Sequence, residues 1–556
     1  MARDRIAITV VNRVSRLVIG GAGLLWLNLT GRPGLAAIGQ AVLNPVIEVG
    51  VVQRFGENPQ TNLVLESLPG DRLSLRFTTN GQPQTLIATR VVVGTAPEAL
   101  PQPDLQERVV LSQHRSFESA EYSAQAWRQR GIQAEIAQPK SWEVWANRQA
   151  YQTPLLRRLL VNNLKAQGFT KIYLDSRVVN QVSRSFFEVN GNRYYRDRLT
   201  LASGKGQIRM LEAATARVYG GTLRLQPNAY GTFTLVNQVP IETYLRGVVP
   251  HEIGPGAPIA AIQAQTILAR TYALRNLRRF AIDHYQLCAD TQCQVYRGLD
   301  GTVRGTDQAI QATRGQVLVY RNELVDALYS STTGGITAAF SDLWNGPDRP
   351  YLKPVVDSVA RIWNLTRQPL NLEPNFKAFI ALRQNFNETG WKLFRWRYDS
   401  SLPEIATDLR QFLQQKQDPQ AEFQQVISLA VANRSVSGRV QALNIETDRG
   451  QVRLEKDEIV RALSAPRSLL FYLEPIYQTP ASAPGVTAPS LIGYGFIGGG
   501  WGHGVGLSQT GAYRLANLGW SYPGFYSFII LAPACNQFGL RLLSGEILGP
   551  LLPSKN

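Results

Sequence analysis

From Pro45 to Gly94 the pattern of hydrophobic and polar residues is that of extended chain, which predicts β-strands. Two such runs span 46–52 and 73–77, and Pro69-Gly70-Asp71 before the second run predicts a turn. Three prolines within 97–104 indicate a linker. We therefore expect residues 42–104 to form a strand-rich N-terminal segment.

Over residues 105–180 the spacing of hydrophobic residues changes from that of strands alone to that of strands and helices in turn. Strand-like runs there alternate with helical runs at 118–130 and 153–167, and a glycine follows each helical run. The resulting order, β-α-β-β-α-β, is that of a small α+β module. In order and length it resembles SPOR-type peptidoglycan-binding modules. The alternative is a subdomain that only packs on its neighbour.

Residues 195–540 are expected to form a larger domain. Strand-like runs recur over 195–250, and Asp448-Arg-Gly450 predicts a hairpin turn. Apolar residues three or four apart predict a prominent helix over 257–280. Residues 477–490, rich in Pro, Ala, Ser and Thr, predict a flexible connection. The predicted fold class is α+β: a strand-rich mixed catalytic domain plus the small module.

The N-terminus has the pattern of an export signal. Four arginines between positions 3 and 16 precede an apolar run, 17–29, which is shorter than the about 20 residues that span a bilayer. Small residues follow at Gly39 and Ala41. We interpret 1–41 as a signal peptide or signal anchor, with a buried strand or helix as the alternative. The protein is then exported to the periplasm or cell wall, and any membrane contact is through this segment.

Composition narrows the classes of partner. The 556 residues are 44% hydrophobic and 18% charged, which indicates a folded protein. Lys and Arg number 58 against 41 Asp and Glu, a net charge of +17 that favours an anionic partner. The basic residues are scattered, which argues against nucleic-acid binding. Three cysteines are too few for a disulfide scaffold.

One carboxylate stands out as a candidate acid. Glu252 follows a run that ends in a proline and precedes Gly254-Pro-Gly256, so we expect it on a loop between a strand and the 257–280 helix. It could serve in acid–base chemistry or cap that helix. Arg270 lies further along the same helix. A His-Glu-x-x-His metalloprotease motif is excluded, because its second histidine would fall at Pro255.

Three blocks of the chain, in order, resemble the SpoIID/LytB-type family: 239–274, 330–353 and 500–511. The resemblance implies a lytic transglycosylase that cuts peptidoglycan between N-acetylmuramic acid and N-acetylglucosamine. The family's catalytic glutamate aligns with Glu252, and a supporting arginine aligns with Arg270. LytB-type members are instead modifiers of a partner amidase, which leaves a non-catalytic glycan binder as the alternative.

A single carboxyl group suffices for lytic transglycosylation. Protonated Glu252 would donate to the glycosidic oxygen, and its carboxylate would then take the proton of the muramyl C6 hydroxyl as a 1,6-anhydro ring closes. Ordinary glycosidases need two carboxyl groups instead. Such a donor works best with a raised pKa, which an apolar pocket provides.

Other residues of the second and third blocks are candidate substrate contacts. His503 lies among alternating glycines whose spacing does not fit a nucleotide-binding loop. Turn chemistry, or a buried structural histidine, is the alternative role for such residues. The candidate contacts are Ser331, Thr332, Lys353, His503, Ser508 and Gln509.

A compact cluster, His284, Cys288 and Cys293, raises the question of zinc. Some SpoIID-type proteins bind zinc in this region, but only three ligands can be named here, and a structural site needs four. A Cys288–Cys293 disulfide is the simpler interpretation for an exported protein. We therefore expect no required cofactor, with a zinc ion at His284, Cys288 and Cys293 as the alternative to the disulfide. The expected partners are peptidoglycan glycan strands, with or without stem peptides, and, in the alternative, an amidase.

Overall fold

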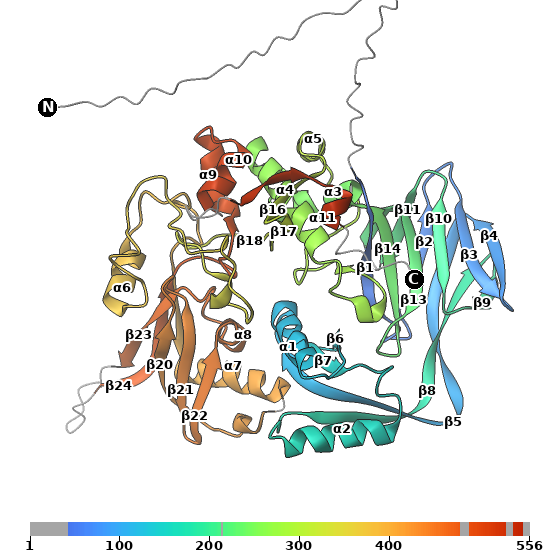
Figure 1. The fold of residues 1–556 in the computed structure, drawn as a ribbon, viewed down its shortest axis with the longest axis horizontal. Helices are drawn as coiled ribbons and strands as arrows, with labels where there is room; N and C mark the ends of the chain where they lie inside the picture. Colours follow the sequence, from blue (N-terminus) through green and yellow to red (C-terminus); the bar gives the residue numbers. More distant parts are fainter. Residues whose placement is uncertain (1–42, 213–214, 417, 479–488, 530–536, 549–556) are drawn as a thin grey trace, which may run out of the picture. The chain divides into compact units, whose positions relative to one another are not determined.

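The computed structural model describes residues 43–212, 215–416, 418–478, 489–529 and 537–548 (Figure 1). The export signal predicted at 1–41 and most of the connection predicted at 477–490 lie outside these residues. None of the helices that the structure describes combines the length and the hydropathy needed to cross a membrane.

Two large sheets contain most strands of the N-terminal half. The first has the order β15 (Leu287–Cys288), β1 (Val46–Phe55), β14 (Phe233–Pro240), β13 (Thr222–Pro227), β10 (Leu199–Ser203), β3 (Leu73–Thr79) and β4 (Gln82–Ala88). The second has the order β12 (Thr215–Gly220), β11 (Gln207–Glu212), β2 (Leu63–Ser67), β5 (Arg90–His114), β7 (Trp142–Ala146) and β6 (Ala134–Ala137), while β8 (Tyr173–Val189) pairs with β5 and with β9 (Asn192–Tyr195).

The alternation in the sequence sets which strand faces are buried. Leu73 and Leu75 of β3 are fully buried, and Leu63 and Leu65 of β2 are at most 1% exposed. All four belong to one hydrophobic core. Core residues from both sheets are thus continuous. Strand β1 pairs with β14, and β2 pairs with β11. Strands from 42–104 therefore share both sheets with strands from 195–240.

The linker predicted at 97–104 is wrong, because these residues lie inside the long strand β5. Here β5 pairs with β8, and the register shifts between Ala99 and Asp104. The neighbouring strands β2 and β7 contact β5 only at 90–93 and 110–114. Proline lacks an N–H donor but is tolerated at such an irregular stretch, where one edge of the strand is unpaired.

The β-α-β-β-α-β order predicted for 105–180 is confirmed: β5, α1 (Phe117–Gln129), β6, β7, α2 (Pro154–Ala166) and β8 follow one another (Figure 1). The strands lie in the spatial order β8-β5-β7-β6. Trp142 of β7 faces the core that includes α1, whereas Trp145 packs on the other side with Ala229 and Tyr230. Both faces of this small sheet are therefore covered, at least in part.

The rest of the chain adds helices and small sheets, and the α+β fold class is confirmed. The helices are α3 (Ile241–Glu252), α4 (Ile259–Arg275), α5 (Arg304–Ala312), α6 (Glu373–Ala381), α7 (Leu402–Gln415), α8 (Glu458–Ala462), α9 (Gln509–Asn517), α10 (Tyr522–Ile529) and α11 (Gly545–Leu548). The small sheets are β17 (Glu323–Leu324), β16 (Gln316–Tyr320) and β26 (Phe538–Leu542); β18 (Tyr329–Ser330) and β25 (Leu507–Ser508); β19 (Trp396–Ser401), β24 (Ser490–Gly498) and β23 (Phe471–Gln478); and β20 (Val426–Arg434), β21 (Val440–Thr447) and β22 (Gly450–Glu455). The prominent helix appears as α4, and the hairpin at 448–450 joins β21 to β22.

Candidate active site

Glu252 is the last residue of helix α3, and not part of a loop after a strand as predicted. Ile241, Tyr244, Leu245, Val248 and Val249 are spaced by one, three or four residues and are all buried, which favours a helix with one face inward. Pro250 is accommodated because it removes only one backbone hydrogen bond in the last turn. Gly254, with φ +85°, follows the helix end.

The carboxyl group of Glu252 is partly buried and held by two donors. The backbone N–H of Val295 donates to Oε1 at 2.7 Å, and the Tyr329 hydroxyl also hydrogen-bonds the carboxyl group. Burial raises the pKa of Glu252, and these two hydrogen bonds oppose that rise without cancelling it. No cation of the described residues contributes to the shift. The group therefore has the raised pKa that suits a proton donor.

A chain of polar side chains extends from this carboxyl group into the core. Gln294 Nε2 donates to the Tyr329 hydroxyl oxygen at 3.0 Å, and the Tyr244 hydroxyl donates to Gln294 Oε1 at 3.2 Å. Because Tyr244 is on α3 itself, the chain returns to the helix that ends in Glu252. The position of the carboxyl group is thus fixed from two sides.

The backbone at the end of α3 is held by the third sequence block. Gln509 Nε2 donates to the Glu252 carbonyl at 2.9 Å and lies 3.3 Å from Gln265 Oε1. The Tyr513 hydroxyl donates to the Ile253 carbonyl at 2.5 Å. These contacts satisfy carbonyls that a helix end leaves without intrahelical partners. Gln509 therefore contacts the candidate acid through its backbone.

Glu252 faces a cavity of about 540 Å³. The β-α-β-β-α-β module supplies part of its wall, from the start of α1 and from the turn between β6 and β7. The lining residues are Arg115, Ser116, Phe117, Glu118, Gln138, Lys140, Ser141, Trp142, Glu252, Tyr272, Arg279, Thr291, Gln292, Cys293, Val295, Leu328, Tyr329, Trp344, Arg461 and His503. Aromatic rings and polar groups thus share the surface, as is usual for a site that binds an organic ligand.

Four cations and two carboxyl groups line this cavity. Arg115 and Arg461 both pair with Asp457, and Arg279 pairs with Glu118. Lys140 is exposed and has no hydrogen bond or ion pair with any residue that the structure describes. It is therefore a cation of the wall that is free to meet an anionic ligand.

His503 is the one predicted substrate contact that lines the cavity. Its Nδ1 accepts a hydrogen bond from the Val505 N–H at 3.0 Å, and its ring lies 5.3 Å from the Trp344 ring. Burial lowers the pKa of His503 to about 4, so the ring is neutral at neutral pH. Ser508 is fully buried; it caps α9 by accepting from Gly511 N–H at 3.0 Å and donates to Glu388.

Four other candidates do not line the cavity. Arg270 is fully buried and forms a bidentate ion pair with Glu242, at 2.8 Å for both contacts, which ties α4 to α3. Lys353 pairs with Asp348. Thr332 is buried in a backbone bridge to Trp501, and Ser331 is exposed, with its carbonyl accepting from Thr510. Each of these four residues is thus engaged in an ion pair or a backbone contact outside the cavity.

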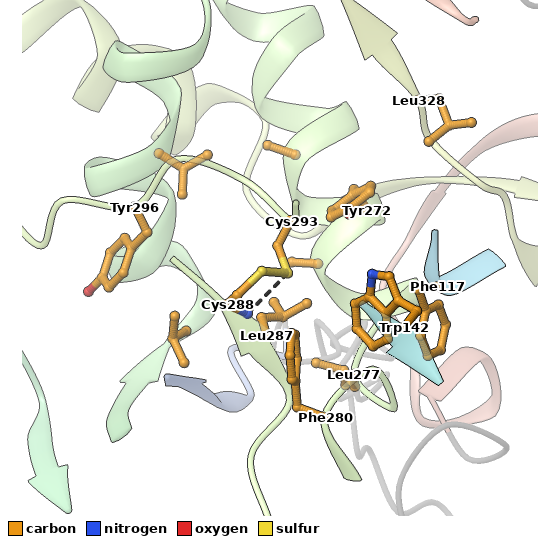
Figure 2. Close-up of a cluster of buried hydrophobic side chains, with 14 of the residues drawn as sticks. Phe117, Trp142, Tyr272, Leu277, Phe280, Leu287, Cys288, Cys293, Tyr296 and Leu328 are labelled. Atoms are coloured by element: carbon orange, nitrogen blue, oxygen red, sulfur yellow. Dashed lines mark hydrogen bonds between the residues drawn. A yellow bond between two sulfur atoms is a disulfide. The ribbon is translucent and has the colours of Figure 1, made fainter. Parts of the chain in front are cut away.

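The cysteine pair of the predicted metal cluster forms a disulfide, Cys288–Cys293, with its Cα atoms 5.6 Å apart (Figure 2). His284 is exposed and has a left-handed backbone, with φ 56°. A disulfide sulfur is not a thiolate, so it lacks the donor that zinc requires. Among the described residues, no group of three or more His, Cys, Asp and Glu side chains is arranged to hold a metal ion.

Sequence reasoning missed several residues of the cavity. Tyr329 immediately precedes the second block, and Trp344 lies within it, so their nearness to His503 had a weak sequence signal. Glu118 and Lys140 had none, since they lie in the module, more than a hundred residues before Glu252. Only tertiary packing brings these segments together.

Comparison with known proteins adds family information. Residues 229–320 match the family model described as "Stage II sporulation protein", and residues 338–506 match a domain of unknown function, DUF8618. The amidase enhancer of Bacillus subtilis (strain 168) is 26% identical over 394 residues, which cover 64% of this chain and 51% of that protein. The chain thus spans about half the length of that relative.

Two further relatives match shorter or different portions. An uncharacterized protein of Brachyspira hyodysenteriae is 26% identical over 317 residues, which are 56% of this chain and 70% of that protein. Stage II sporulation protein D of Bacillus subtilis is 29% identical over 153 residues, which are 24% of this chain and 44% of that protein. Glu252 and the disulfide both lie within the segment matched by the first family model.

Proposed function

Because this chain is a SpoIID-type protein, we propose that it is an exported lytic transglycosylase that cuts the glycan strands of peptidoglycan in cell-wall remodelling. The observation that carries the proposal is the Glu252 carboxyl group: it faces a cavity of about 540 Å³, its pKa is raised by burial, and two donors hold it in place. A carboxyl group with a raised pKa keeps its proton to higher pH than a solvated glutamate does, and it can still lose that proton during a reaction.

The proposed reaction uses Glu252 twice. Its protonated carboxyl group donates to the oxygen between N-acetylmuramic acid and N-acetylglucosamine while that bond breaks. The carboxylate then accepts the proton of the muramyl C6 hydroxyl, whose oxygen bonds to C1 and closes the 1,6-anhydro ring. Water takes no part. Glu118, the other carboxyl group of the cavity, is paired with Arg279, which supports a mechanism with one acting acid.

A second candidate function is favoured by one relative. The protein named amidase enhancer matches 64% of this chain. In this alternative the chain binds glycan without cutting it and stimulates an N-acetylmuramoyl-L-alanine amidase. The substitution Glu252→Gln separates the two functions, because it removes the ionisable proton but keeps the shape of the side chain.

Mass spectrometry of purified glycan strands tests the proposal. Strands with and without stem peptides are incubated with residues 42–556, with the Glu252→Gln variant and with Glu323→Gln, a control at an exposed glutamate of β17. We expect 1,6-anhydromuramyl ends from the wild type and from Glu323→Gln, and a loss of at least about 100-fold in Glu252→Gln.

Other products would point elsewhere. Reducing ends would show hydrolysis and would contradict the transglycosylase proposal. Binding without cleavage, combined with stimulation of an added amidase by both the wild type and Glu252→Gln, would establish the second function.

A further inference from the structure

The disulfide lies at the base of a loop that reaches the candidate acid. Cys288 is fully buried at the end of β15, whose parallel pairing with β1 places it beside Gly50 in the first sheet. Figure 2 shows the two sulfurs close to Leu287 and Phe280 in the hydrophobic core. The S–S bond therefore ties Cys293 to a fixed part of the fold.

The active-site loop, defined here as residues 289–296, carries the contacts that hold the acid. Val295 donates its N–H to Glu252 Oε1 at 2.7 Å. Gln294 donates to the Tyr329 hydroxyl oxygen at 3.0 Å, and Tyr329 in turn contacts the Glu252 carboxyl group. Both residues follow Cys293 by one or two positions, so the location of Cys293 sets theirs.

The active-site loop is also held by hydrogen bonds. At its end the buried Tyr296 hydroxyl donates to Asn237 Oδ1 of β14 at 2.7 Å, whereas at Gln292 the bonds involve partly exposed atoms. Arg279 Nη1 donates to the Gln292 carbonyl at 3.2 Å, and the Gln138 side chain donates to that of Gln292. Tyr296 N–H donates to the Ala289 carbonyl at 3.0 Å and closes the loop on itself. A hydrogen bond at an exposed atom contributes little net stability, because it replaces a hydrogen bond to water. Apart from the backbone that enters the loop at Ala289, the disulfide is thus the one covalent link between the active-site loop and the first sheet.

We propose that Cys288 and Cys293 are positioning residues, whose disulfide holds the active-site loop so that Val295 and Gln294 fix Glu252, and that a dithiol lowers the activity by cleaving this bond. The inference rests on the proposed function of Glu252.

The exposure of the two cysteines indicates the order of the reductive step. Cys293 is 9% exposed and lines the cavity, whereas Cys288 is 0% exposed. A thiolate of the dithiol attacks Sγ of Cys293, forms a mixed disulfide and displaces Cys288 as a thiolate, which takes a proton. The second thiolate of the reagent then attacks the reagent's sulfur in the mixed disulfide, not the sulfur of Cys293. The reagent becomes a cyclic disulfide, and Cys293 is released as a thiol.

The test uses residues 42–556 as the wild type, a Cys288→Ala/Cys293→Ala double variant and a Cys535→Ser control. Each protein is assayed with and without dithiothreitol. We expect reduction and the double substitution each to lower kcat by about tenfold or more. The double variant should no longer respond to dithiothreitol, whereas Cys535→Ser should behave as the wild type does.

A pH profile separates positioning from a merely structural role. The Val295 N–H lowers the pKa of Glu252, so losing it raises that pKa. Because the acid must be protonated at the start of the reaction, the fall of kcat at high pH should move to higher pH. Hydrogen–deuterium exchange of a peptide covering 289–296 gives a readout independent of cleavage, and reduction should increase its uptake.

Unchanged kcat and unchanged exchange after confirmed reduction would overturn the proposal. If the wild type cuts no glycan, the proposed function has failed, and exchange alone then decides the positioning role: increased uptake in the active-site loop supports it and unchanged uptake refutes it. If the double variant does not fold, as judged by circular dichroism, the reduced wild-type protein carries the comparison.

Discussion

At the scale of single residues, the donors to Glu252 act against its burial. Burial raises the pKa of this carboxyl group, and the Val295 N–H and the Tyr329 hydroxyl lower it. The balance leaves a group that is easier to protonate than a solvated glutamate. Each donor therefore sets where on the pH scale the acid can act.

Replacing Tyr329 by phenylalanine removes one of these donors while keeping the ring. The pKa of Glu252 should then rise further, because the remaining hydrogen bond opposes burial less well. In the proposed mechanism the protonated form begins the reaction, so we expect the fall of kcat at high pH to move to higher pH in Tyr329→Phe. The control is Tyr526→Phe, whose hydroxyl donates to the Ala264 carbonyl at 2.8 Å. A shift to lower pH would contradict this account of the site.

Gly506, in the third sequence block, is required by close backbone packing. Gly506 has φ +77°, and a Cβ there would lie 2.0 Å from the Leu328 carbonyl oxygen, next to the cavity. Gly519 has a similar φ of +82°, but a Cβ there would meet nothing within 4 Å. The two positions differ in packing and share the same backbone conformation.

This pair separates strain from steric clash. Gly519→Ala should cost about 1–2 kcal/mol, the penalty of a left-handed backbone for alanine. Gly506→Ala should cost more than that and should lower the thermal midpoint more, because the Leu328 backbone must also move. Differential scanning fluorimetry of both variants measures the difference, and equal midpoints would show that the contact near Leu328 is readily relieved.

At the scale of elements, helices α3 and α4 are joined by a buried ion pair. Arg270 on α4 is fully buried and forms two hydrogen bonds with Glu242 on α3, while its Nη1 donates to the Gln316 carbonyl of β16 at 3.1 Å. The arginine therefore fixes the helix that carries Glu252 without reaching the cavity.

Removing this arginine should mainly affect stability. Arg270→Ala leaves Glu242 without its partner in a partly buried place, for which a loss of about 3–5 kcal/mol is expected. The control is Arg246→Ala, which breaks a similar pair with Asp307 whose side chains are both 38% exposed, and which should cost at most about 1 kcal/mol. Thermal unfolding measures both. If Arg270→Ala has the thermal midpoint of the wild type but no longer cleaves glycan, Arg270 would have a direct role in the reaction and not the structural role described here.

Several elements could be predicted from local patterns. The hairpin at 448–450 and the helix over 257–280 followed from turn residues and from spacing, and the structure has both. The linker at 97–104 was wrong because β8, which is distant in sequence, pairs with those residues. The strand predicted before Glu252 is a helix in the structure. The proline suggested the end of a strand, whereas the spacing of Tyr244, Val248 and their neighbours favoured a helix.

The candidate site was predictable only where its residues lie in recognised blocks. Glu252 and His503 were found in this way, and both line the cavity. The chemistry of Lys353 or Arg270 depends on which partner folding brings to them, and here Asp348 and Glu242 occupy those cations. Glu118 and Lys140 reach the cavity through tertiary packing, which no local pattern reveals.

At the scale of the whole molecule, the module at 105–180 is a wall of the cavity as well as a packed subdomain. The ring of Trp142 lies 5.2 Å from that of Phe280, and Trp145 lies 6.0 Å from Tyr230. Its strands β5 and β8 continue beyond the module, with β5 pairing to β2. Much of its apolar surface is therefore covered by the rest of the chain.

We expect the isolated fragment 105–180 to remain largely unfolded. Separation would expose Trp145 and the side of Trp142 that contacts Phe280, and so small a domain has little stability in reserve. A two-dimensional NMR spectrum of the fragment should show poor dispersion, while the mature protein folds. A well-dispersed spectrum would instead support an autonomous module of the SPOR type.

The hydrogen bond from Gln509 to the end of α3 also has a consequence for the synthesis of the protein. A ribosome supplies residue 509 long after residue 252, and His503 and Arg461 are late as well. An unfinished chain therefore carries the acid without the backbone contacts and wall residues that arrive last. Under the proposed function, competence to cut arises only after almost all of the polypeptide has been synthesised, so incomplete translation products should cut no glycan.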